Sequence, residues 1–166
     1  MSCKFNGKIS AEFTPPKTWV LEKALSFTVG TDHGITADDM DTLQEIGVNI
    51  ANSGGDRTDR ITCKKGMVTD LASVPRVVWN VIAPWDVARA AVIHDHLYAV
   101  LRNYYNKDHG VSNNWQSRWA EARAISDKVF LLGMQDAEPT VPKWKIYSAY
   151  WSVRVFGSVP ASKNDE

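Results

Sequence analysis

The sequence lacks any long apolar run. Its most apolar stretches are interrupted by charged or polar residues well before the roughly 20 residues that a helix needs to span a bilayer. The start of the chain, MSCKFNGKISAEF, also lacks the apolar core of a secretory signal peptide. We therefore expect no transmembrane segment and no signal peptide, in a protein that is made in a cytoplasm.

The chain also lacks an excess of either charge, and it has few cysteines. Its 19 Lys and Arg residues balance 19 Asp and Glu residues, and no basic block is present. Because nucleic-acid binding depends on clustered cations that neutralise phosphates, we expect no nucleic-acid partner. The two cysteines, Cys3 and Cys63, match no zinc or redox spacing, so we predict two free thiols.

The N-terminal half contains several short segments with the composition of strands. Residues 17–29 predict two strands separated at Glu22–Lys23, and residues 60–70 predict a hairpin with a central turn. Between them, residues 30–59 are polar and rich in glycine, with a short helix expected at 37–46. We interpret this stretch as an insertion or excursion that packs at the periphery and adds little to the core.

The C-terminal half has the pattern of helices. We predict helices over residues 86–102, 114–135 and 141–156, with Gly157 ending the last of them and a polar tail at 158–166. The predicted fold is α+β, with a single domain over residues 1–166. In it, a small antiparallel β-sheet from the N-terminal half packs on a C-terminal bundle of about three helices.

The helix predicted at 86–102 carries polar side chains on the face that should be buried. At 100° per residue, His94 and Tyr98 lie one turn apart in the middle of its most apolar face, with Asp95 at the flank. Such side chains are buried only where other groups satisfy their hydrogen bonds. His96 points about 160° away from His94, so a metal ion bound through His94 and Asp95 would exclude His96.

A second mismatch lies on the next helix, where Asp127 interrupts an apolar stripe and Arg123 precedes it by one turn. We predict that His94 and Asp127 lie close together on antiparallel helices, because pairing them satisfies both. One interpretation is a site in which the carboxylate orients the imidazole as a general base or a metal ligand. The other is a buried structural network, in which Asp127 accepts hydrogen bonds from Tyr98 and His94.

Four segments resemble the signatures of a phage- and prophage-encoded family of unknown function. They are Gly66 to Arg76 (GMVTDLASVPR), Ala90 to Tyr98 (AAVIHDHLY), Arg123 with Asp127 and Phe130, and Tyr150 with Val153, Arg154, Phe156 and Gly157. The resemblance implies a bacteriophage protein, located in the virion or in the host cytoplasm. It also implies other phage structural proteins as partners.

The pair of helices is also similar to that of phospholipase A2. This likeness implies that His94 is a general base for water, that Asp95 binds a divalent metal ion, and that Tyr98 and Asp127 orient the histidine. The glycine-rich calcium loop and the disulfide framework of that family are missing here. A metal ion would therefore need a further ligand, such as Asp70.

Two functions from different classes follow. The first is a hydrolase, metal-dependent or not, that acts on host envelope material, either lipid or peptidoglycan. Its residues divide into a catalytic group (His94, Tyr98, Asp127) and a metal-binding group (Asp95, Asp70). The alternative is a non-catalytic structural component of a phage tail or baseplate. The first function predicts that His94 reaches a solvent-connected pocket bordered by the turn at residues 70–73, and the second predicts a dry, fully bonded core.

Overall fold

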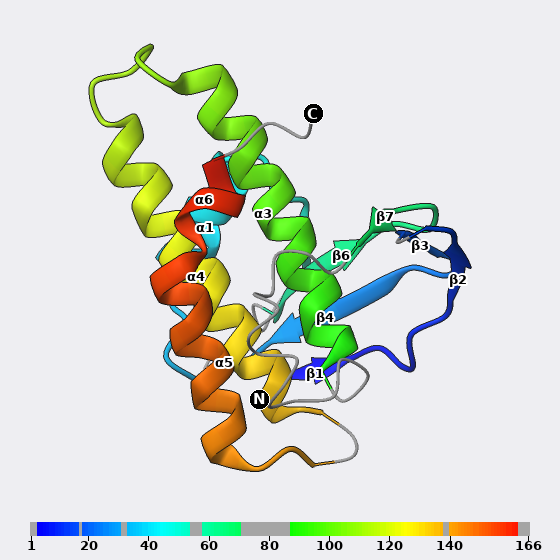
Figure 1. Ribbon diagram of the computed structural model, residues 1–166. Coiled ribbons are helices and arrows are strands. Elements are labelled where there is room, and N and C mark those ends of the chain that lie inside the picture. Colours follow the sequence, from blue (N-terminus) through cyan, green and yellow to red (C-terminus); the bar gives the residue numbers. More distant parts are fainter. Residues whose placement is uncertain are drawn as a thin grey trace.

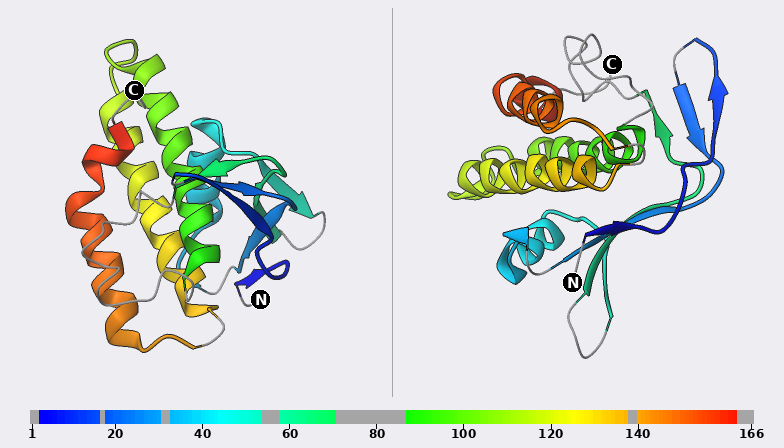
Figure 2. Two further views of the ribbon diagram at one scale, coloured as in Figure 1. Left: turned by 45° about the vertical axis from the view of Figure 1, so that its right-hand side comes forward. Right: turned by 90° about the horizontal axis from the view of Figure 1, so that it is seen from below.

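A computed structural model of the protein describes residues 3–16, 18–30, 33–53, 58–70, 87–137 and 140–162. It confirms the α+β class, with two antiparallel sheets built from the N-terminal half and four helices from the C-terminal half (Figure 1). Seen from below, the long helices α3 and α4 form a central layer, with α5 and α6 on one side and α1 on the other (Figure 2).

The larger sheet has the strand order β1-β4-β6-β5. Its strands are β1 (Lys4–Phe5), β4 (Leu25–Val29), β6 (Thr58–Cys63) and β5 (Ile50–Ser53). Phe27 of β4 lies directly opposite Ile61 of β6, and both side chains are fully buried. This face of the sheet therefore forms one wall of the core, against which α3 packs.

The smaller sheet has the order β2-β3-β7 and consists of β2 (Ala11–Thr14), β3 (Thr18–Leu21) and β7 (Val68–Thr69). The expected hairpin over residues 60–70 is wrong, because β6 pairs with β4 and β5 whereas β7 pairs with β3. The reason lies in the turn between β6 and β7. Gly66 donates its backbone N–H to the carbonyl of Leu21, and Leu21 donates to the carbonyl of Met67, so the chain leaves one sheet for the other.

Two long helices form an antiparallel pair, α3 (Ala88–Asp108) and α4 (Trp115–Gln135). Helix α3 extends six residues beyond the predicted end at Arg102, because the residues between Arg102 and Gly110 include neither Gly nor Pro. Gly110 itself adopts a φ of 77°. None of the described helices combines the length and the apolar character that a membrane span requires.

The chain then forms α5 (Lys143–Phe156) and the short helix α6 (Ser158–Ser162). The prediction of a polar tail is wrong for residues 158–162, because Ala161 is fully buried and α6 packs on α3. Arg102 also ties the two helices together by donating to the carbonyl of Pro160 at 3.1 Å.

The expected short helix is present as α1 (Ala37–Glu45), and a capping box between Thr36 and Asp39 begins it. However, the expectation that residues 30–59 add little to the core is wrong. Their polar average conceals apolar side chains that join the main core cluster: Ile35, Met40, Leu43, Ile46, Val48 and Ile50. The sequence also predicts a short helix that begins at Ser73 and runs through Ile82, and this segment lies outside the described residues.

Candidate functional site

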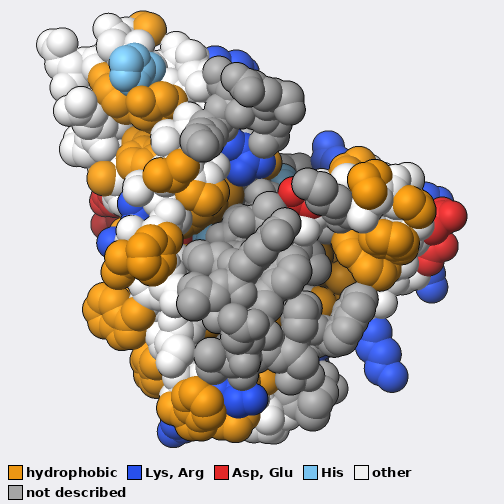
Figure 3. Space-filling view, viewed as in Figure 1, with side chains coloured by type: hydrophobic (Ala, Val, Ile, Leu, Met, Phe, Trp, Pro, Cys, Tyr) orange, Lys and Arg blue, Asp and Glu red, His pale blue; other side chains and the backbone are white. Residues whose placement is uncertain are grey.

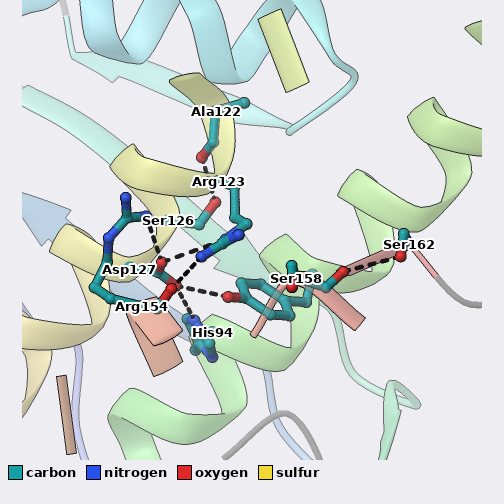
Figure 4. Close-up of polar contacts among 9 residues, drawn as sticks. His94, Ala122, Arg123, Ser126, Asp127, Arg154, Ser158 and Ser162 are labelled. Atoms are coloured by element: carbon teal, nitrogen blue, oxygen red, sulfur yellow. Dashed lines mark hydrogen bonds and ion pairs between the residues drawn. The ribbon is translucent and has the colours of Figure 1, made fainter. Parts of the chain in front are cut away.

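The centre of the candidate site is the carboxylate of Asp127, which α4 places in the core with no exposed surface. One oxygen, Oδ1, accepts hydrogen bonds from His94 Nε2 at 2.9 Å and from Tyr98 Oη at 2.7 Å, both on α3. The other, Oδ2, accepts from Arg154 of α5 at 2.8 Å (Figure 4). The predicted closeness of His94 and Asp127 on antiparallel helices is confirmed.

The electrostatics of this site keep Asp127 ionised. Burial alone raises the pKa of its carboxyl group, but hydrogen bonds from His94, Arg154 and Tyr98 outweigh burial and leave the pKa below its usual value. Burial and the neighbouring carboxylate together raise the pKa of Tyr98, so its hydroxyl remains a donor. Because an ionised carboxylate has no proton to give, Nε2 of His94 carries the hydrogen in this pair.

The helix α5 contributes Arg154 to the site, and Gly157 follows directly after the helix. Arg123 of α4 donates to the backbone carbonyl of Arg154, and its Nε lies 3.8 Å from Oδ2 of Asp127. A Cβ atom at Gly157 would lie only 2.3 Å from Tyr98 Oη, so this close approach requires glycine. Residues from α3, α4 and α5 therefore meet at a single carboxylate.

The structure separates Asp95 from this network. Thr69, at the end of β7, donates its hydroxyl to Oδ2 of Asp95, which is 8% exposed. The carboxylate of Asp95 also helps to raise the pKa of Cys63 on β6, although burial is the larger cause. Asp70 follows Thr69 and is exposed. Asp95 thus faces the sheets while His94 faces α4.

Nothing described in this region assembles a metal centre. Within the ranges that the structure describes, no three His, Cys, Asp or Glu residues are grouped so that they could hold a metal ion. The metal-binding roles of Asp95 and Asp70 stay predictions. His96 is half-buried, and its pKa is lowered by burial and, to a smaller extent, by Lys64. Cys3 and Cys63 are free thiols, as predicted.

The expected opening from His94 to solvent is wrong. The imidazole is 0% exposed, as is Tyr98, and the ring of His94 lies between Tyr98 at 4.1 Å and Phe130 at 4.7 Å between centroids. Ser73, which was expected to border the pocket, lies outside the described residues. The site is an ionic network inside the core, in which Arg123 Nε is buried without a hydrogen-bond partner among the described residues.

Sequence reasoning found His94, Tyr98 and Asp127 but missed the direct contact of Arg154 with Asp127. Its side chain is 30% exposed, so its position on α5 has the pattern of an ordinary surface cation. The only signal was its place in the late segment that ends at Gly157. Arg123, which precedes Asp127 by one turn on the same helix, is the more distant of the two cations from the carboxylate.

Comparison with protein families assigns the chain to a family whose function is unknown. The family described as "protein of unknown function (DUF1353)" matches residues 49–153. The chain belongs to this family. The DUF1353 match includes β5, β6, β7, α3, α4 and most of α5, and so contains His94, Tyr98 and Asp127, whereas Arg154 lies just beyond it. Comparison with curated proteins and with solved structures finds no match.

Proposed function

We propose that the protein is a non-catalytic structural component of a bacteriophage particle, in the tail or baseplate. In this role, the Asp127 network holds three helices in one fixed arrangement. The observation that supports the proposal is the complete burial of Asp127, His94 and Tyr98, with both carboxylate oxygens bonded to neighbouring helices. A site closed to this degree offers a substrate no surface.

Physical chemistry gives such a network a role in specifying geometry. Apolar side chains would fill the same space, but they tolerate small shifts of one helix along another, whereas hydrogen bonds to a buried charge do not. Asp127 fixes α4 against α3 through His94 and Tyr98, and against α5 through Arg154. These bonds keep α5 in a constant position relative to α3 and α4, as an assembly component requires.

The assignment to a phage particle is supported by the four segments that resemble phage and prophage signatures. The structure adds that three hydrogen bonds link residues of all four segments. Thr69 of the first bonds Asp95 of the second, and Asp127 of the third bonds His94 of the second and Arg154 of the fourth. The residues that carry the resemblance therefore hold this fold together, which fits a structural protein.

One observation favours a second candidate, a hydrolase that acts on envelope lipid or peptidoglycan. Nε2 of His94 lies 2.9 Å from Oδ1 of Asp127, the pairing in which a carboxylate orients a histidine as a general base. Tyr98 shares the same carboxylate, as the likeness to phospholipase A2 implies. Asp95 and Asp70 remain candidate ligands if a divalent metal ion takes part.

The variant His94→Asn distinguishes the two candidates. If the network is structural, the wild type releases neither fatty acid from phospholipid vesicles nor soluble fragments from peptidoglycan, with or without calcium. His94→Asn then lowers the melting temperature by several degrees, because about 1–3 kcal/mol is lost when a buried hydrogen-bonding group loses its partner. The hydrolase would be favoured instead if the wild type hydrolyses either substrate and His94→Asn abolishes that activity without changing the melting temperature.

The assignment to a particle needs its own measurement. Mass spectrometry of phage particles purified through a density gradient should find the protein at a constant number of copies per particle. Protein present in the infected-cell lysate but washed from purified particles would contradict a structural role in the virion.

A further inference from the structure

The outer face of α5 is an exposed row of large apolar side chains. Trp144 is 63% exposed and Trp151 is 61% exposed, and the row follows the helical spacing of 3 or 4 residues. The row consists of Trp144, Tyr147, Trp151 and Val155, and we call it, together with the adjacent exposed Phe156, the α5 aromatic face. Figure 3 shows apolar side chains gathered along the left margin of the molecule, where α5 runs.

The charged residues in the segment that carries this face are all cations. Residues 140–162 contain Lys143, Lys145 and Arg154 and no Asp or Glu, although the whole chain has balanced charge. Arg154 is bonded to Asp127, whereas Lys145 Nζ lies 5.7 Å from the centre of the Trp144 ring. The two lysines therefore stand at one end of the aromatic row, with a local charge that attracts anions.

The hydroxyl groups beside the row are already satisfied. Ser148 donates to the carbonyl of Trp144, and Ser152 donates to the carbonyl of Ser148, each at 2.8 Å. In a helix, a serine that bonds the carbonyl four residues earlier has an acceptor for its hydroxyl proton and needs none from outside. A partner that covered this face would have few hydrogen bonds to supply.

The geometry points to an anionic lipid bilayer surface as the partner of the α5 aromatic face. Trp and Tyr concentrate where apolar chains meet headgroups, and lysines beside them reach the lipid phosphates. A second copy of this chain fits less well. Pairing two α5 helices in either direction would bring Lys143 and Lys145 against a helix face that offers no acidic residue.

The proposal is tested by flotation of the full-length protein with vesicles that contain phosphatidylglycerol, compared with neutral phosphatidylcholine vesicles. We expect the wild type to float with the anionic vesicles and to bind less as salt is raised, since exposed charges are screened. Trp144→Ser/Trp151→Ser should lower the apparent partition coefficient at least tenfold. Lys143→Gln/Lys145→Gln should lower it about fivefold for each lysine.

Matched controls come from elements other than α5. Phe13→Ser removes an aromatic side chain from β2 that is 46% exposed, and Lys65→Gln/Lys107→Gln removes two exposed lysines distant in sequence from α5. Both controls should bind as the wild type does. Circular dichroism melting curves confirm that each variant is folded before it is assayed.

Four results would each overturn the proposal. They are a wild type that does not float with anionic vesicles, a Trp144→Ser/Trp151→Ser variant that floats as well as the wild type, controls that lose binding to the same extent, and equal binding to neutral vesicles. A wild-type dimer that binds no vesicles and becomes a monomer in Trp144→Ser/Trp151→Ser would assign the face to a second copy instead.

Discussion

Replacing Asp127 by asparagine removes the charge at the centre of the network while keeping the shape of the side chain. The amide oxygen of asparagine can still accept from His94 and Tyr98. Its NH2 group, however, replaces Oδ2 and points a donor at the guanidinium of Arg154, where an acceptor now lies at 2.8 Å. The substitution therefore strands a cation and a donor in a partly buried place.

The size of the effect follows from these contacts. A hydrogen bond to a charged group contributes about 1.5–3 kcal/mol, and removing one partner of a buried ion pair destabilises by about 3–5 kcal/mol. Arg154 is 30% exposed and can turn partly toward water, so we expect the lower end, about 3 kcal/mol. For a chain of this length, such a loss lowers the melting temperature by roughly 6–12 °C.

The assay is urea and thermal unfolding followed by far-ultraviolet circular dichroism. Glu121→Gln, an equally isosteric change at an exposed position of the same helix, is the control and should stay within about 0.5 kcal/mol of the wild type. A loss below about 1 kcal/mol in Asp127→Asn would refute the reasoning, because the buried charge would then not be holding the helices. If the variant fails to fold, Arg154→Gln tests the same contact more gently.

Three further predictions use other features of the core. Gly157→Ala should destabilise the protein by about 1–3 kcal/mol in urea unfolding, because the added methyl group overlaps Tyr98 Oη, and an unchanged midpoint would contradict the close approach. Because the network lowers the pKa of Asp127, its stabilisation is present above the ordinary carboxyl pKa of about 3.9 and is lost as pH falls through the lower folded value. The gap in melting temperature between wild type and Asp127→Asn should therefore shrink below about pH 4, and a gap that widens there would be inconsistent. Burial raises the pKa of Cys63 to about 12, so a thiol reagent at pH 8 should modify Cys3 in the native protein and Cys63 only after unfolding.

The helical half of the fold could be predicted from the sequence because its signals are local. The spacing of apolar side chains located α3, α4 and α5, and the polar residues that interrupted those stripes identified His94 and Asp127 as partners. A charged group on an apolar stripe requires a partner. The sequence did not show which face of the neighbouring helix carries that partner.

The sheets could be predicted only in part, because strand pairing depends on contacts that are distant in sequence. The segments of β6 and β7 were located, but their separation into two sheets depends on backbone bonds between Leu21 and the turn at Gly66 and Met67. No local pattern near residue 66 indicates a partner more than 40 positions earlier. Pairing across such distances is decided by the assembled fold rather than by the segment.

The mean polarity of residues 30–59 obscured their role for a different reason. Only a few of these residues need to be apolar for the stretch to join the core, and Met40 and Leu43 are three apart on one face of α1. An average over the whole stretch gives weight to the acidic residues of its solvent face. Periodicity within the helix, rather than composition, carries the information.

The exposure of His94 is the point at which sequence and structure lead to different functional conclusions. Residue types and spacing are the same for a general base held by a carboxylate and for a structural histidine held by one, so the sequence left both interpretations open. Burial separates them, because a base must meet water or substrate whereas a structural histidine must not. With His94, Tyr98 and Asp127 all at zero exposure, the same three residues that suggested hydrolysis support a core that fixes the position of α5.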